Sequence, residues 1–342
     1  MKDLTSALLA FAHFLLLITS YYIVKPVRDT LFVKRIGPEM LPYFYLLVAA
    51  ITLVVVWAYN RLLRRCEARR FVLYVQAAVA LNLLLFWQLM LADVAMSAVF
   101  FVWASVYNIL LVTLFWSLTN DLFDAARGRR YYGLIGGGGI IGGILGSSLT
   151  VWLPSRIGTA HCLLVAAALM VAATLLTFWR LAHAPAREPS TLLESAPPHP
   201  SLWTDAHLLI DDRHVRLIAS IVFFLTLART IFNYHYFHLV DALVTGTDAT
   251  TAFFGKVYMA TNITGAVLQF FVTSVVLRFF GAKGGLVFSP VVLFSSMGAL
   301  LFSPLLLVAA AFNVAQQATS YSINQASKEL LYTPTSEAVK YR

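Results

Sequence analysis

Long apolar stretches, most of them near twenty residues, follow one another along almost the whole chain and are separated by short polar segments. A helix of that length spans the hydrocarbon core of a bilayer, and it satisfies its own backbone hydrogen bonds there. The pattern therefore predicts an all-α polytopic membrane protein. We count ten candidate spans, over residues 5–24, 40–60, 71–92, 95–118, 131–153, 159–181, 215–237, 252–277, 285–302 and 305–326.

Composition supports this class of protein. Hydrophobic residues make up 60% of the 342 and charged residues 12%, with a mean hydropathy of +0.77, whereas soluble domains are about half apolar and about a quarter charged. The formal charge of +9 could indicate a nucleic-acid-binding protein, but basic loops also fix the orientation of membrane proteins. We therefore expect membrane lipid around the protein and no nucleic-acid partner, and no obligate protein partner is evident.

The sequence lacks the residue patterns of hydrolytic, redox or metal chemistry. It has no His-Glu-x-x-His motif and no serine–histidine–aspartate set. Its two cysteines, Cys66 and Cys162, form neither a disulfide framework nor a cysteine metal site. We expect no cofactor, no metal and no enzymatic activity. His13, inside the first span, is expected to be a packed or hydrogen-bonded histidine rather than a proton relay.

Basic loops predict the orientation of the spans. Segments 61–70, 126–130, 182–214 and 278–283 are rich in Lys or Arg and are predicted to be cytoplasmic. With an even number of spans both termini fall on that side, and a bacterial inner membrane is the expected location. The segment KPVRDTLFVKR (25–35) departs from the rule, because it is basic yet predicted to lie outside. Some other interaction must therefore hold its charges there.

The order of spans and loops predicts three parts. These are a six-helix bundle over 1–182, a cytoplasmic linker rich in Pro, Ser and charge over 183–214, and a second bundle over 215–342. This is the plan of a major-facilitator-type transporter, which normally has six helices in each bundle. With about ten helices of an expected twelve, the second bundle is predicted to be truncated after four helices, or the chain is an unusual ten-helix protein.

The glycine-rich segment GGGGIIGGILGS (136–147) lies inside the fifth span. It lacks the Gly-Lys-Ser/Thr of a phosphate-binding loop. Gly138, Gly142 and Gly146 are spaced four residues apart, as in the small-xxx-small pattern that lets membrane helices approach closely. We interpret the segment as a helix-packing surface.

Three charged residues lie within about one turn of each other at the end of the first span, beside Pro26: Lys25, Arg28 and Asp29. They could be interfacial residues that snorkel to the membrane surface, with Lys25 and Asp29 paired at i, i+4. Alternatively, Lys25 and Arg28 form a cationic clamp for an anionic substrate, because a guanidinium offers phosphate a bidentate fork.

Polar residues at helical spacing form stripes on three later spans. Their candidate substrate-binding members are Arg229 and Asn233, Asn262 and Gln269, and Asn313, Gln317 and Asn324, with Lys328 just beyond the last stripe. A charge in mid-span costs about 2.5–3.5 kcal/mol on insertion scales, so Arg229 is expected to face a cavity or a partner carboxylate. A functional role and a structural ion pair are both consistent with its position.

Four segments are similar to those of a known family: KPVRDTLFV (25–33), LFWSLTNDLFD (114–124), FFGKVYMATNITGAVLQFF (253–271) and SKELLYTPTSEAVKYR (327–342). Through them the chain resembles the ATP/ADP translocase (NTT-type nucleotide transporter) family of bacteria and plastids, including divergent bacterial relatives. The last of the four segments is the most specific.

The resemblance implies a major-facilitator-like fold of twelve helices that exchanges nucleotides across a membrane without consuming them. It also implies that Arg28, a lysine in the transporters, and Lys328 are functional. Two departures stand out. The transporters have Trp-Gly-Glu-Leu-Tyr in the fourth helix, where this chain has Trp-Ala-Ser-Val-Tyr (103–107), and a second family glutamate aligns with Ala249.

These observations predict a transporter that exchanges nucleotides of the ATP/ADP type, or related phosphorylated anions, by alternating access. Arg28, Arg229 and Lys328 would converge on a central cavity and neutralise the phosphates, while Asn and Gln side chains meet the base or ribose. Two alternatives remain: a non-transporting or degraded relative that acts as a membrane scaffold, and a proton-coupled transporter of a different solute.

Overall fold

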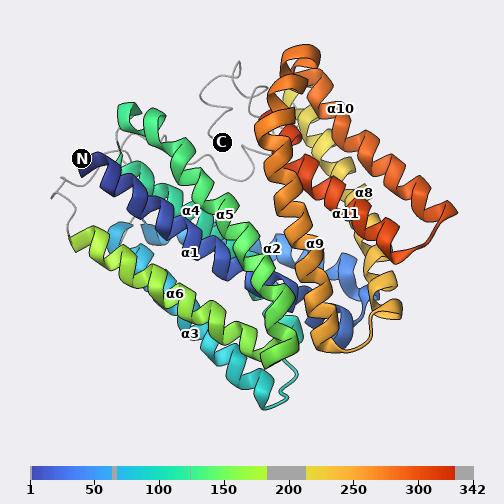
Figure 1. Cartoon of the computed structure of the whole chain (residues 1–342), viewed down its shortest axis with the longest axis horizontal. Helices are drawn as coiled ribbons and strands as arrows, with labels where there is room; N and C mark the ends of the chain where they lie inside the picture. The colour runs from blue at the N-terminus through green and yellow to red at the C-terminus, as the bar shows by residue number, and fades with distance from the viewer. Residues whose placement is uncertain (1, 64–67, 124, 183–212, 328–342) are drawn as a thin grey trace. The chain divides into compact units, whose positions relative to one another are not determined.

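The computed structural model describes residues 2–63, 68–123, 125–182 and 213–327 (Figure 1). These residues are almost entirely helical and include no strand. The α-helices are α1 (Lys2–Leu31), α2 (Leu41–Leu63), α3 (Ala68–Leu91), α4 (Ser97–Leu122), α5 (Ala125–Ile157), α6 (Thr159–Ala182), α8 (Arg213–Leu243), α9 (Thr247–Val267), α10 (Thr273–Phe302) and α11 (Leu306–Thr319). The 3-10 helix η2 (Pro38–Met40) precedes α2, and π-helical segments are η1 (Phe32–Ile36), η4 (Leu268–Val272) and η5 (Ser320–Asn324).

Seven helices within the described ranges are long and apolar enough to cross a membrane. They are Asp3–Ile36, Pro38–Tyr59, Arg70–Leu91, Ser97–Asn120, Arg130–Ile157, Thr159–Ala182 and Thr247–Gly281. Each of the ten predicted spans coincides with a helical segment, and the break between the eighth and ninth falls at Gly281, whose φ of 64° is non-helical. The prediction of an all-α polytopic membrane protein is confirmed.

The chain divides into two compact units. Unit 1 comprises Met1–Ser190 and Val240–Met259, and unit 2 comprises Thr191–Leu239 and Ala260–Arg342. Unit 1 thus contains α1 to α6 together with the end of α8 and the first half of α9. The predicted linker at 183–214 lies almost wholly outside the described residues, so the bundle boundaries proposed from the sequence stay a prediction.

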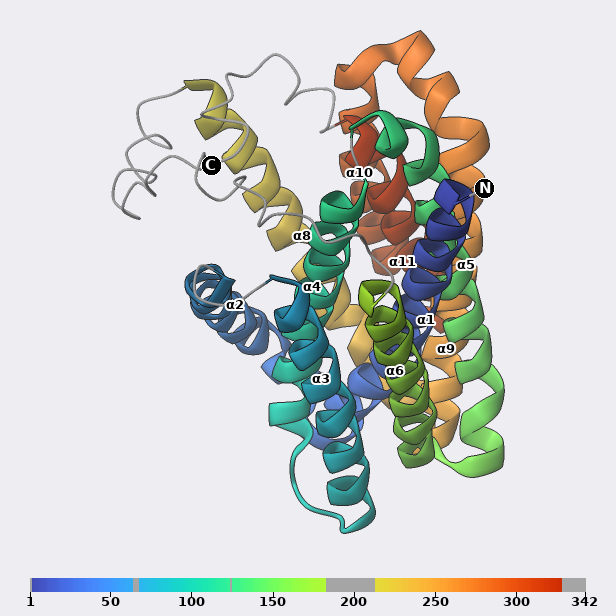
Figure 2. The ribbon, with the colours of Figure 1, turned by 90° about the vertical axis from the view of Figure 1, so that its left-hand side faces the viewer.

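In unit 1, helix α1 is the central element. It packs against α4, α5 and α6, while α3 packs against α6 and α4, as the two views show (Figures 1 and 2). The core contains apolar residues from five helices, including Leu17, Leu83, Phe115, Ile135 and Met170, all fully or almost fully buried.

Glycines bring α5 into direct contact with the backbone of α1. A Cβ atom built on Gly138, Gly142 or Gly146 would lie 2.5, 2.6 and 2.4 Å, respectively, from the carbonyl oxygens of Phe11, Leu15 and Thr19. Real side chains do not tolerate such distances, so only glycine fits at these three successive turns. The interpretation of this segment as a helix-packing surface is confirmed.

The sequence suggested that the basic segment 25–35 is a connection between spans. It is helical instead and forms the end of α1 and most of η1. Pro26 removes the backbone N–H that would bond to the carbonyl of Tyr22. The hydroxyl of Thr150 on α5 lies 3.3 Å from that carbonyl oxygen and shares its proton with the carbonyl of Gly146, 2.8 Å away. A side chain of a neighbouring helix thus supports the backbone that proline leaves unbonded.

The first half of α9 packs into unit 1 through small residues. A Cβ on Gly255 would lie 2.9 Å from a backbone carbon of Thr150 on α5, and the hydroxyl of Thr251 donates to that of Thr30 on α1 at 3.0 Å. In unit 2, α10 packs against α11 and η5, and η4 contacts η5. Gln316 of α11 donates to the hydroxyl of Ser296 on α10 at 2.6 Å.

Candidate substrate-binding site

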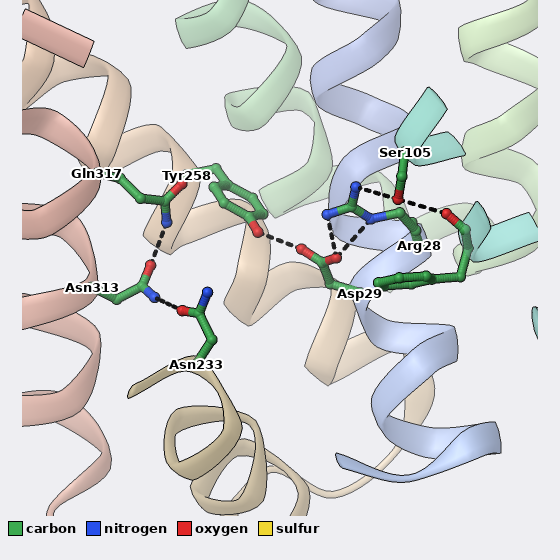
Figure 3. A network of polar contacts seen from close by, with 8 residues as sticks. Arg28, Asp29, Ser105, Asn233, Tyr258, Asn313 and Gln317 are labelled. Atoms are coloured by element: carbon green, nitrogen blue, oxygen red, sulfur yellow. Dashed lines mark hydrogen bonds and ion pairs between the residues drawn. The ribbon is translucent and has the colours of Figure 1, made fainter. Parts of the chain in front are cut away.

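Arg28 lies in the last turn of α1 and is held by residues of α1 and α4 (Figure 3). Its Nε and Nη2 approach Oδ1 of Asp29 at 2.8 and 2.7 Å. Its Nη1 donates to the hydroxyl of Ser105 at 3.2 Å, and the ring of Phe101, one turn earlier on α4, lies 5.1 Å from the guanidinium carbon. Arg28 is 15% exposed and Asp29 1%, so a half-buried guanidinium pairs with a buried carboxylate.

Tyr258 of α9 completes the cluster. Its hydroxyl donates a hydrogen bond to Oδ2 of Asp29. Its ring lies 4.0 Å from Nζ of Lys25, and the ring of Tyr22 lies 5.5 Å from the same atom. Because these rings face a buried ammonium that is largely removed from water, their attraction is stronger than at an exposed site.

The snorkelling alternative is wrong for this segment. Lys25 is 7% exposed and packs between tyrosine rings, and Asp29 bonds to Arg28 and Tyr258. Lys25, Arg28 and Asp29 together carry a net charge of one positive unit, since two cations face one carboxylate. We call these three residues with Ser105 and Tyr258 the arginine cluster.

The other two basic residues of the segment also have partners. Lys34 pairs with Asp241 at 2.8 Å, and Arg35 pairs with Asp93 at 2.8 Å. Every cation between residues 25 and 35 therefore faces a carboxylate or an aromatic ring. These contacts explain how several basic residues close together are stabilised at this end of unit 1.

A second cluster lies in unit 2 and consists of carboxamides from two stripes (Figure 3). Asn313 of α11 donates to the side-chain oxygen of Asn233 on α8 at 3.3 Å. Gln317, one turn further along α11, donates to Asn313. Arg229, one turn before Asn233, donates to the hydroxyl of Ser320 at 2.9 Å. We call Asn233, Asn313 and Gln317 the amide cluster.

The remaining sequence candidates are placed differently. Asn324 in η5 is 3% exposed, and its side-chain oxygen has no hydrogen-bond partner among the described residues. Asn262 is half-buried, whereas Gln269 is exposed in the π-helical segment η4. Lys328 lies outside the described residues. The structure thus joins Asn233, Asn313 and Gln317 by hydrogen bonds, whereas Arg229 bonds to Ser320 and Gln269 is exposed.

Two residues of the arginine cluster could not be assigned to it from the sequence. Ser105 stands where the resembled transporters have a glutamate, and that departure was the signal for its position. Tyr258 gave no signal, because a tyrosine in an apolar span is usually a packing residue.

His13 belongs to a separate buried network in unit 1. Its Nδ1 lies 3.0 Å from Nη1 of Arg180, and its Nε2 lies 2.9 Å from the side chains of both Gln76 and Thr177. Arginine only donates, so Nδ1 of His13 accepts from Arg180. His13 is thus a hydrogen-bonded core histidine, as predicted.

In unit 1 the arginine cluster offers cations and aromatic rings, which are suited to binding an anion, and in unit 2 the amide cluster offers hydrogen-bond donors and acceptors. Within the ranges that the structure describes, no group of three or more His, Cys, Asp or Glu side chains could hold a metal ion. Residues 75–308, more than half of the chain, match the model of the TLC ATP/ADP transporter family.

The chain belongs to the TLC ATP/ADP transporter family. It is a multi-pass integral membrane transporter of a small-molecule substrate, not an enzyme. No curated protein sequence gives a significant match.

Solved structures support the fold of this TLC family member. A crystal structure of the nucleoside transporter NupG is 15% identical, covers 99% of this chain and 84% of its own, and superposes with a TM-score of 0.56. A crystal structure of a point mutant of NupG is also 15% identical, covers 100% of this chain and 85% of its own, and superposes with a TM-score of 0.61. At this identity the likeness concerns the fold, and it confirms the predicted major-facilitator-like architecture.

Proposed function

We propose that this TLC family member exchanges nucleotides, or related phosphorylated anions, across the membrane by alternating access. The observation that carries the proposal is Arg28, a half-buried guanidinium inside a membrane span. Its contacts with the described residues leave part of its hydrogen-bonding capacity unused. Of its five N–H groups, two point to Asp29 and one to Ser105. One N–H on Nη1 and one on Nη2 remain for an anion.

Phosphate is the ligand best matched to these donors, because its oxygens accept charge-assisted hydrogen bonds from guanidinium nitrogens. The family's description names ATP and ADP, and the two structural neighbours described above are nucleoside transporters by title. The amide cluster supports a nucleoside portion, since Asn and Gln both donate and accept. That Arg28 and Arg229 act on the same substrate stays a prediction.

Uptake measurements test the proposal. Cells or proteoliposomes containing the full chain are expected to take up labelled ATP or ADP, and uptake should rise when unlabelled nucleotide is preloaded on the opposite side, as exchange requires. Arg28→Ala should lower uptake at least about tenfold, the loss expected for a charge-assisted contact. Arg35→Ala is the matched control, because Arg35 is also an ion-paired arginine but is 53% exposed and outside the cluster.

Other outcomes would identify the alternatives. Uptake of an unphosphorylated solute that nucleotides do not inhibit would favour a transporter of a different solute. Failure of every tested solute to enter, with the protein folded in the membrane, would favour a non-transporting scaffold. If Arg28→Ala and Arg35→Ala behave alike, Arg28 does not bind the substrate.

We further propose that the protein lies in a bacterial inner membrane with segments 61–70 and 126–130 facing the cytoplasm. The test uses a variant in which both native cysteines are replaced by serine and one cysteine is introduced at Arg61 or at Asp93. An impermeant thiol reagent added to intact cells should label the second variant but not the first. The reverse pattern would mean the opposite orientation.

A further inference from the structure

We propose that Asp29 determines how much charge the transported anion can carry, by cancelling one of the two positive charges of the arginine cluster while it fixes the orientation of Arg28. The inference rests on the proposed function and extends it from a substrate class to the residue that selects within that class. Asp29 is here a positioning and specificity-determining residue.

The carboxylate of Asp29 is held on both oxygens. Oδ1 accepts a hydrogen bond from Nε of Arg28 and forms an ion pair with its Nη2. Oδ2 accepts a hydrogen bond from the hydroxyl of Tyr258. Its side chain is 1% exposed and thus almost completely shielded from solvent. The negative charge is therefore a fixed part of the cluster.

Asp29 occupies only one edge of the guanidinium. The Nε and Nη2 groups face Asp29, and Nη1 faces Ser105, which comes from a different helix. These contacts hold the plane of the guanidinium in place and leave one N–H on each of Nη1 and Nη2. An incoming phosphate would therefore bind Arg28 without displacing Asp29, and both anions would contact the same guanidinium.

Charge balance then decides which anions bind well. With Asp29 ionised, Lys25 and Arg28 present one net positive charge, and each additional negative charge on the substrate is repelled by Asp29 in surroundings that screen charge poorly. Without the carboxylate charge, the same residues present two. The site as built therefore favours the most highly charged members of a phosphate series less strongly than the same site would without the carboxylate charge.

Asp29→Asn is the informative change, because asparagine keeps the size of the side chain. It can still accept from Arg28 and can still hydrogen-bond to Tyr258. The measurement is binding to the purified full chain of two series of anions with increasing charge: AMP, ADP and ATP, and orthophosphate, pyrophosphate and tripolyphosphate. We expect Asp29→Asn to raise the affinity for the triphosphate relative to the monophosphate by about tenfold in each series.

Two controls separate charge from geometry. Ser105→Ala removes the other acceptor of Arg28, and Tyr258→Phe removes the hydroxyl that holds Asp29, but neither alters the charge of the cluster. Both are expected to weaken binding across a series by a similar factor and to leave the affinity ratio unchanged. Should Asp29→Asn fail to fold, Ser105→Asp, compared with Ser105→Asn, places a second carboxylate beside Arg28 and should shift the ratio toward the monophosphate.

Each result decides between the proposals. An unchanged ratio in Asp29→Asn and in Ser105→Asp overturns the role of Asp29 in charge selection, as does a ratio shift of equal size in Ser105→Ala. If the inorganic series binds with the expected ratio shift but nucleotides do not bind, the nucleotide function is wrong and the role of Asp29 stands. If no phosphate-bearing anion binds to the wild type, both are wrong.

Discussion

The carboxylate of Asp248, in the first turn of α9, accepts a hydrogen bond from the backbone N–H of Thr159 at 2.7 Å and another from its hydroxyl at 2.6 Å. Thr159 is the first residue of α6. The preceding residue, Gly158, has a φ of 83° and no side chain that could cap the helix. Asp248 therefore provides from another helix the acceptor, and the negative charge, that the start of a helix favours.

Replacing Asp248 by alanine should lower the stability of the purified protein by about 1–2 kcal/mol, the usual loss for a helix cap. Asp248→Asn keeps an acceptor without the charge and should lose less. Thermal unfolding in detergent, followed by tryptophan fluorescence, measures both. Equal melting temperatures for wild type and Asp248→Ala would show that this contact does not stabilise α6.

The glycine surface of α5 gives a second prediction. In Gly142→Ala the new methyl group meets the carbonyl oxygen of Leu15 at 2.6 Å, so α1 and α5 must separate, at a cost of about 1–3 kcal/mol. Gly136→Ala is the control, since no described atom lies within 4 Å of its Cβ position and alanine favours a helix by up to about 1 kcal/mol. Thermal unfolding should rank Gly136→Ala at or above wild type and Gly142→Ala below it. The opposite order would contradict backbone contact.

The His13 network predicts a loss of stability from a single buried side chain. His13→Ala leaves an N–H of Arg180 and the amide of Gln76 without the imidazole, at about 1–3 kcal/mol for each unsatisfied group. His161, on the same helix as Arg180, is half-buried and contacts the ring of Trp87, so His161→Ala should cost less. Chemical unfolding of the two variants compares them. Similar losses would mean that the network contributes little.

Two residues of α11 are expected to separate transport from stability. Asn313 bonds within the amide cluster, whereas Gln316 bonds to the buried Ser296 of α10. Asn313→Ala should raise the KM for nucleotide exchange several-fold with little change in melting temperature. Gln316→Ala should lower the free energy of unfolding by about 1 kcal/mol or more and leave the KM nearly unchanged. If Gln316→Ala alone impairs exchange in fully folded protein, the assignment of the amide cluster is wrong.

The helices could be predicted from the sequence because the length of an apolar stretch is a local property. The residue at which the first helix ends could not be predicted in this way. Lys25, Pro26 and Arg28 together resemble the end of a membrane helix, yet α1 continues through them. What permits this is distant in sequence: the hydroxyl of Thr150 beside the Tyr22 carbonyl, and Tyr258 beside Asp29.

The candidate site was predictable to a similar degree. Helical spacing correctly placed Asn233 and Asn313 on polar faces of their own helices, but spacing does not say which faces meet. It also fails where the helix changes type. Gln269 lies in η4, whose wider π-helical turn shifts the phase of the helix, so projecting an α-helical period from Asn262 misplaces it.

The contact between α1 and α5 has a consequence for movement. Helices separated by interlocking side chains can slide past one another when rotamers change. Along three successive turns α1 and α5 have main chain against main chain instead, so an independent shift of α1 would drive backbone atoms into each other. Arg28 and Asp29 therefore belong to a helix that cannot move independently of α5. Any displacement that an anion causes at Arg28 must be transmitted along α5 as well.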